Sequence, residues 1–389
     1  MVRSMYRLRD KYAIAGIGFT QFTKESGRTT RSLASEACLN ALIDAGLEPD
    51  EVDGIISFNM GDSDPGIAIA TELGISNAQY FVDIFGGGNV AVAFMLQAAA
   101  VIEAGLATNV LCFRSMNGRS GLRLGGSRVQ KSQGFSQYTA PFGLMTYPQA
   151  MAMWCRRHIS KYGTTAKQLG TIAVNARANA GLNQRAMQRA PMTLDDYFAS
   201  RPIVDPFRMY DICLESDGAC AVLITSSERA KDLKQPPVYI MGGAYGGGPS
   251  QGFSFEDIMR WPDPAHNCFK YIAQSLWTSA GAGPTDMDFA EIYDCFTYST
   301  IMGLEGLGFC AEGEGGPFIE TGAIALDGTI PVNTHGGLLS EAYIHGFNHT
   351  IEAVEQLRGV AGSRQVAGAS VGLVTAGAMT SGGAMVLRN

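Results

Sequence analysis

An internal duplication constrains the fold of this 389-residue chain more than any other feature of its sequence. Residues 33–53 and 268–288 align at a constant offset of 235, with apolar side chains at the same helical spacing in both copies. Each copy then carries Ala-Gly, a proline three residues after that glycine, an acidic turn and an apolar segment. Glycine caps a helix in the left-handed conformation, and proline prevents its continuation. Each copy therefore predicts a helix, a turn and a strand.

The predicted elements around the two copies indicate the fold class. Strands are expected at residues 12–19, 54–58, 80–85, 109–113 and 219–224, and again at 238–245, 289–293, 330–333 and 370–375. Helices are expected at residues 90–104 and through 351–357. Strands that alternate with helices favour a mostly parallel sheet covered on both faces.

Two fused units of this kind predict an α/β protein built as a five-layered α/β/α/β/α sandwich. We expect the halves to be residues 1–235 and 236–389. Residues 116–211 interrupt the first half and predict an inserted loop region, a common place for lids and binding loops.

The composition excludes several classes of protein. Hydrophobic residues make up 46% of the chain and charged residues 17%, which excludes an intrinsically disordered chain. The longest apolar stretch, residues 90–102, contains Gln97 and is too short to span a bilayer. The eight cysteines form no CxxC pair, so neither a zinc site nor a disulfide framework is predicted. We expect a cytoplasmic protein, without a membrane span or a metal site.

Charge is distributed unevenly along the chain. Residues 104–194 contain nine Arg and three Lys but no Asp or Glu, whereas the whole chain has a net charge of −7. Such a segment predicts an anionic neighbour. The arginines are not interleaved with aromatic residues, which argues against nucleic acid and favours a phosphate-bearing small molecule or an acidic protein surface. A positive loop at a subunit contact is the alternative. Arg119, Arg123 and Arg128 are the candidates for contact with such phosphates or with such an acidic protein surface.

Four motifs resemble the thiolase superfamily, in particular its sterol-carrier or lipid-transfer-type branch. They are residues 308–316, residues 331–340, Tyr293-Asp294-Cys295-Phe296 and Ser216-Asp217-Gly218-Ala219. The resemblance covers essentially the whole chain, and it implies the same layered fold.

The chain departs from the thiolase pattern where the chemistry of a thiolase takes place. The turn where the family carries its nucleophilic cysteine reads Phe85-Gly86-Gly87-Gly88-Asn89, and no cysteine lies within 20 residues of it. The second family cysteine is replaced within residues 375–379. Two histidine positions of the family hold Tyr343 and Tyr293. Acyl transfer through a thioester intermediate requires a thiolate, so a thiolase reaction is not expected.

This pattern resembles the steroid side-chain-cleaving aldolases of cholesterol-degrading actinobacteria, lipid-transfer-protein-like subunits that work with an OB-fold partner. The resemblance implies a β-hydroxyacyl-CoA substrate with its hydroxyl on the steroid D ring, cleaved by a retro-aldol reaction into propionyl-CoA and a 17-ketosteroid. It implies no metal or nicotinamide cofactor. It also implies a homodimer that forms a heterotetramer with an acyl-CoA-binding OB-fold partner.

The residues present fit that chemistry. Retro-aldol cleavage needs a base for the hydroxyl, stabilisation of the thioester enolate and an acid for the α-carbon, but no nucleophile. We expect Tyr343 and Tyr293 to handle the protons and the enolate. Tyr245 is expected to orient or deprotonate the hydroxyl. His335 is a candidate donor to the thioester oxygen or a group that tunes Tyr343, and His345 is another possible base.

The remaining candidates surround these residues in the motifs. The candidates for binding substrate or CoA are Phe85, Gly86, Gly87, Asn333, Gly377, Arg119 and Arg123. Asp294 is expected to hold loop backbone, and His158 and His266 to be structural.

Two alternative functions stay open. One is a non-catalytic acyl-CoA-binding or assembly subunit. The other is a thiolase whose nucleophile has moved to Cys295 or Cys112, although a buried packing role is favoured for Cys295.

Overall fold

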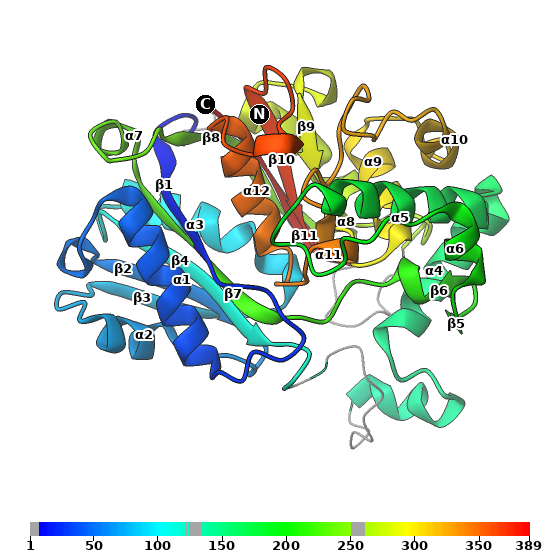
Figure 1. The fold of residues 1–389 in the computed structure, drawn as a ribbon, viewed down its shortest axis with the longest axis horizontal. Coiled ribbons are helices and arrows are strands. Elements are labelled where there is room, and N and C mark those ends of the chain that lie inside the picture. The colour runs from blue at the N-terminus through cyan, green and yellow to red at the C-terminus, as the bar shows by residue number, and fades with distance from the viewer. Residues whose placement is uncertain (1–7, 122, 124–133, 250–260) are drawn as a thin grey trace.

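The computed structural model describes residues 8–121, 123, 134–249 and 261–389. Within them, one mixed nine-stranded sheet runs in the order β3-β2-β4-β7-β1-β8-β11-β10-β9 (Figure 1). Its strands are β1 Tyr12–Phe19, β2 Gly54–Asn59, β3 Tyr80–Phe85, β4 Val110–Asn117, β7 Asp217–Ser226, β8 Val238–Gly247, β9 Phe289–Glu291, β10 Val371–Ala376 and β11 Ser381–Arg388.

The sheet repeats one arrangement twice. In the first half, β2 lies parallel to β3 and β4, and β7 lies antiparallel to both β4 and β1. In the second half, β9 lies parallel to β10, and β11 lies antiparallel to both β10 and β8. The halves join where β1 pairs antiparallel with β8 at Ala13–Tyr239 and Ile14–Val238. The strand order therefore carries the duplication that the sequence predicts.

Two predictions about the strands are wrong. The sheet is mixed rather than mostly parallel, since a turn of four residues joins β10 to β11 and such a short connection requires antiparallel strands. The predicted strand at residues 330–333 forms only an isolated parallel bridge between Ala290 and Val332. Pro331 has no N–H to donate, and the chain turns at Asn333, where φ is 52°.

Helices form three layers, one on the outer face of each half of the sheet and one between the two halves. On the outer faces, α1 Thr30–Ala45 contacts β1, β4 and β7, and α8 Cys268–Ala280 contacts β8 and β11. Both end on left-handed glycines, Gly46 (φ 75°) and Gly281 (φ 64°), as the repeat predicts.

The middle layer contains α3 Ala93–Glu103 and α12 Phe347–Leu357. Each contacts strands of both halves, so these two helices form the central layer of the five-layered sandwich.

The inserted segment is largely helical, not a loop. It contains α4 Tyr147–Tyr162 and α5 Ala166–Gly181, each beginning in a capping box, and the short hairpin of β5 and β6. Figure 1 shows it against the second half, where α5 contacts α9, α10 and α11. The remaining elements are α2 Gly66–Leu73, α6 Leu194–Ala199, α7 Ser227–Ala230, α9 Thr297–Leu307, α10 Gly315–Glu320, α11 Gly337–Ser340, β5 Pro202–Val204 and β6 Phe207–Arg208.

Carboxylates of this same chain face much of the acid-free segment. The ion pairs are Arg114–Asp62, Arg123–Glu215, Arg156–Asp205, Lys161–Asp263, Lys167–Glu320 and Arg185–Glu341. For these residues the rest of the fold provides an anionic neighbour, and contact with an external anion stays a prediction. Arg128 lies outside the described residues. Among the helices that the structure describes, none combines the length and the apolar character needed to cross a membrane.

Candidate active site

The hydroxyls of Tyr293 and Tyr343 lie next to each other in the second half of the fold. Tyr293 follows β9 and Tyr343 lies between α11 and α12, and their phenol oxygens are 2.8 Å apart. Tyr293 is buried and Tyr343 is partly exposed. Burial is the main cause that raises the pKa of both phenols well above its ordinary value. Both hydroxyls therefore carry their protons at neutral pH.

Main-chain contacts fix these two tyrosines. The Tyr293 N–H donates to Oγ1 of Thr375 (2.8 Å), and the Tyr343 N–H donates to Oγ of Ser216 (3.1 Å). The side-chain amide of Asn333 accepts from the Ile292 N–H at 2.7 Å and donates to the Ile292 carbonyl at 2.9 Å. Asn333 was predicted to bind substrate, but its side chain is occupied in positioning the residue before Tyr293.

Two glycines leave the space that Tyr293 fills. A Cβ on Gly88 would overlap the Tyr293 hydroxyl, and a Cβ on Gly346 would lie 2.6 Å from the Tyr293 ring. Tyr293 thus reaches the turn at the start of the first-half helix, where a thiolase would carry its cysteine. The Tyr293 phenol occupies the space that a side chain at position 88 would fill.

The rest of this turn contacts other predicted site residues. A Cβ on Gly87 would lie 3.7 Å from Cε1 of His345. Gly377 (φ 80°) approaches Asn89 so closely that a Cβ would lie 2.9 Å from the Asn89 Cα. Burial raises the pKa of half-exposed Tyr245, and hydrogen bonds with Ser381 and Asn89 oppose that rise. The structure therefore brings Tyr245, His345, Gly87 and Gly377 to the same turn as Tyr293. Gly86 belongs to this turn and packs against Val90.

A buried arginine holds His345 neutral. Arg114 pairs with Asp62 at 2.5 Å and donates from Nε to Nδ1 of His345 at 3.2 Å. Burial, followed by the charge of Arg114, lowers the pKa of His345 to about 3. The imidazole keeps its proton on Nε2 and is a hydrogen-bond donor, not the base that the sequence suggested. Sequence reasoning missed this role of Arg114, since Asp62 and His345 are 52 and 231 positions away.

Known proteins are similar to this chain along nearly its whole length. A 17-hydroxy-3-oxo-4-pregnene-20-carboxyl-CoA lyase of Mycobacterium tuberculosis is 41% identical over 377 residues, covering 95% of this chain and 97% of the relative. A steroid side-chain-cleaving aldolase of Thermomonospora curvata is 42% identical over 358 residues, covering 89% and 90%. This chain belongs to the family of steroid side-chain-cleaving aldolases.

Further similarities place these aldolases in the thiolase superfamily. The family model described as "Thiolase C-terminal domain-like" matches residues 250–389. The solved "Ltp2-ChsH2(DUF35) aldolase" superposes with a TM-score of 0.92 at 39% identity, covering 98% of each chain. Human mitochondrial 3-ketoacyl-CoA thiolase in complex with CoA superposes with a TM-score of 0.69 over the whole of both chains, at 15% identity, which shows a shared fold.

Other predicted site residues of this aldolase lie elsewhere. Phe85 is 65% exposed at the end of edge strand β3. Arg119 is on the surface and its main-chain N–H donates to Asp217, and Arg123 is paired with Glu215 at 2.5 Å. Phe85 thus directly precedes the turn that Tyr293 reaches, Arg119 lies at the surface, and a carboxylate pairs with Arg123.

His335 contributes to a buried cluster instead of contacting a thioester. Its Nδ1 lies 2.9 Å from Glu291 and its Nε2 lies 3.5 Å from Glu341. Burial alone would lower the pKa of His335, but Glu341 and Glu291 outweigh it and raise the pKa to about 9. Both ring nitrogens face carboxylates, so the donation of His335 to a substrate stays a prediction that this geometry does not support. As expected, Asp294 holds loop backbone by accepting from the Leu338 N–H at 2.8 Å.

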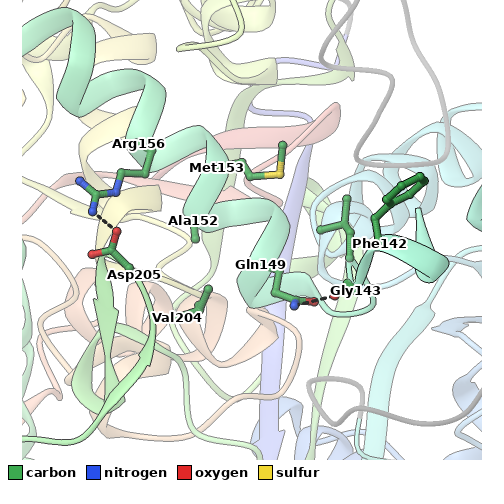
Figure 2. Close-up of a pocket in the computed structure, with 9 residues that line it drawn as sticks. Phe142, Gly143, Gln149, Ala152, Met153, Arg156, Val204 and Asp205 are labelled. Carbon is green, nitrogen blue, oxygen red and sulfur yellow. Dashed lines mark hydrogen bonds and ion pairs between the residues drawn. The ribbon is translucent and has the colours of Figure 1, made fainter. Parts of the chain in front are cut away.

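An open groove lies beside α4 (Figure 2). Phe142, Ala152, Met153 and Val204 provide much of its apolar lining, and the Arg156–Asp205 pair closes one end. None of the site residues predicted from the sequence lines it. The groove is therefore a surface feature of the inserted segment, separate from the tyrosine pair.

The neutral state of His345 gives a prediction about stability against pH. The unfolded chain takes up a proton at a pKa of about 6.5, whereas folded His345 takes one up only near 3. Protonation therefore favours the unfolded chain, and the free energy of unfolding falls as the pH falls. Between pH 7 and pH 5 this histidine should remove about 2 kcal/mol.

Urea unfolding of the wild type and of His345→Gln at both pH values measures this effect. The variant is expected to lose about that much of the pH dependence. The same dependence in both proteins would show that the histidine is already charged in the folded state.

Proposed function

We propose that this aldolase cleaves the side chain of a 17-hydroxysteroid CoA thioester by a retro-aldol reaction, giving a 17-ketosteroid and propionyl-CoA. The observation that carries the proposal is the pair of hydrogen-bonded phenols at the turn that lacks a thiol. The names of the two relatives with 41–42% identity support this substrate class.

The two phenols provide a balanced proton path. As the bond between C17 and the thioester α-carbon breaks, the proton of the 17-hydroxyl passes to the oxygen of one phenol, which in the same step gives its own proton to the other phenol. The electron pair of that bond forms the thioester enolate, and the steroid retains a ketone. That proton crosses the 2.8 Å hydrogen bond between Tyr293 and Tyr343, and the second phenol protonates the α-carbon. Both phenols begin and end protonated, which agrees with their raised pKa values.

Three neighbouring residues support this path. We assign the His345 Nε2–H to the enolate oxygen, because Arg114 fixes that tautomer. Arg114 itself interacts electrostatically with both phenols and favours negative charge there. Tyr245, at the same turn, orients the substrate hydroxyl. The reaction transfers no hydride, so we propose that it needs no nicotinamide, and its steps call on no metal at the reacting atoms.

The thiolase with a relocated nucleophile is disfavoured. Burial raises the pKa of Cys295 to about 12, and burial also raises the pKa of Cys112, which lies inside β4. The thiolate is the attacking species, so both thiols are inert at neutral pH. The tight fit of Tyr293 against Gly88 and Gly346 disfavours the non-catalytic subunit, because a protein without activity has no need to keep two glycines that make room for this phenol.

Incubation with a 17-hydroxysteroid β-hydroxyacyl-CoA, with and without an OB-fold partner, tests the proposal. We expect mass spectrometry to detect the 17-ketosteroid and propionyl-CoA in equal amounts. Unchanged substrate under both conditions would favour the assembly subunit, and a stable acyl adduct on Cys295 would favour the displaced thiolase.

We further propose a cytoplasmic homodimer that forms a heterotetramer with an OB-fold, acyl-CoA-binding partner. Strand β3 is an edge of the sheet and exposes Phe81 (52%), so a second copy can extend the sheet there. The solved Ltp2-ChsH2(DUF35) aldolase is named with a DUF35 partner, which supports a partner of that kind here. Sedimentation of the chain alone should give twice the monomer mass, and monomers at micromolar concentration would contradict the homodimer.

A further inference from the structure

A second cluster of reactive side chains lies behind Tyr293 and has no part in the proposed reaction. Glu291, His335 and His349 are fully buried, and their ligand atoms lie within 4.8 Å of one another. They come from three separate parts of the second half, which are the end of β9, the turn before α11, and α12.

The contacts inside this cluster are ion pairs whose geometry is not that of an ordinary hydrogen bond. Oε2 of Glu291 lies 2.9 Å from Nδ1 of His335 and 3.7 Å from Nδ1 of His349. None of these three atoms has a hydrogen-bond partner among the described residues, although the other Glu291 oxygen accepts from Thr334 at 2.8 Å. Buried polar atoms nearly always find a partner. These three side-chain atoms converge without such a partner, and they therefore lie around a common point.

The outer nitrogens of the two histidines face carboxylates. Nε2 of His335 lies 3.5 Å from Glu341, and Nε2 of His349 lies 3.4 Å from Oδ1 of Asp294. A histidine that ligates a metal usually turns its other ring nitrogen to a carboxylate or a carbonyl, which orients the ring. Both histidines of the cluster show this arrangement.

The charge around the cluster is unbalanced. Five carboxylates face two guanidinium groups, an excess of three negative charges that is reduced to one either by protonation of both histidines or by a divalent cation between neutral histidines; the groups are Glu291, Asp294, Glu341, Glu352, Glu355, Arg185 and Arg364. Buried charge without compensation is costly. A divalent cation would reduce that excess to one.

We propose that Glu291, His335 and His349 bind one structural Zn²⁺, through the Glu291 carboxylate and Nδ1 of both imidazoles. Two imidazoles and a carboxylate are donors that zinc prefers. The ion would tie β9, the turn and α12 together two residues before Tyr293, without touching substrate. No sequence pattern indicates this site, because the three ligands follow no short metal-binding motif. The proposal does not depend on the reaction assigned to the tyrosines.

Metal analysis of the purified protein, expressed in zinc-supplemented medium, tests this site. We expect about one zinc per chain in the wild type, and less than about a tenth of that in His349→Gln and in Glu291→Gln. His158→Gln is the matched control, since His158 is also fully buried and pairs with Glu305 (3.1 Å) outside the cluster. It should retain its zinc. A chelator should lower the melting temperature of the wild type and of the control, but not that of the two ligand variants.

X-ray absorption at the zinc edge of the wild type supports the proposal independently of the variants, which matters if they fail to fold. Two imidazoles and oxygen in the zinc shell are the expected result. A wild type that contains no zinc and takes none up on titration would overturn the proposal, leaving two imidazolium ions between carboxylates. Zinc loss in His158→Gln equal to that in the ligand variants would overturn it too.

Discussion

Replacing Tyr343 by phenylalanine is expected to lower kcat by about 10²–10⁴-fold, the usual contribution of a positioned acid or base. The substitution removes one hydroxyl of the pair and with it the hydrogen bond that joins the two phenol oxygens. The aromatic ring remains and still fills its place beside Cys213 and Cys295. Binding of the CoA thioester should therefore change little, and the loss should appear in kcat rather than in KM.

Tyr298→Phe is the matched control for this experiment. Tyr298 is a fully buried tyrosine in the first turn of α9, and its hydroxyl donates to the Ala265 carbonyl at 3.2 Å. Removing that hydroxyl should cost about 1 kcal/mol of stability and leave kcat within a few-fold of the wild type. Circular dichroism should show Tyr343→Phe folded. Near-normal turnover of Tyr343→Phe would remove Tyr343 from the proton path.

Local sequence signals predicted the parts of this fold that depend on neighbouring residues. The glycine caps of α1 and α8 follow from a left-handed residue placed just after an apolar stripe. The same alignment placed Tyr293 at the end of a second-half strand, where it meets Tyr343. These features need only residues a few positions apart, or a motif that is continuous in the chain.

The sequence did not predict the features that depend on distant partners. The acid-free segment looked unbalanced because its carboxylates follow far along the chain, as in Arg185 with Glu341, Glu352 and Glu355. Asn333 looked like a ligand for substrate because it lies in the family motif of residues 331–340, yet its side-chain amide forms hydrogen bonds with the main chain of Ile292. Burial and pairing decide these roles, and neither is visible in a single sequence.

Placing an alanine at Gly88 is expected to destabilise the aldolase by about 1–3 kcal/mol and to lower kcat at least about 100-fold. Gly88 does not have a positive φ, so its backbone accepts alanine and the substitution alone should be neutral or mildly stabilising. The cost comes from the new Cβ, which would overlap the Tyr293 hydroxyl and drive the phenol away from Tyr343. For the same reason, Gly88→Cys would remove the lyase activity without restoring a thiolase.

A double-mutant cycle separates this clash from a general defect of the turn. In a Tyr293→Ala background the new Cβ has room, so Gly88→Ala should then cost less than about 0.5 kcal/mol. Gly181→Ala is the control, because its φ is not positive and the nearest atom to a Cβ there is 3.6 Å away. It should leave kcat and the urea midpoint nearly unchanged. Equal destabilisation by Gly88→Ala in the wild type and in Tyr293→Ala would mean that the Tyr293 phenol does not occupy the space beside Gly88. The proton path through Tyr293 would then lose its structural basis.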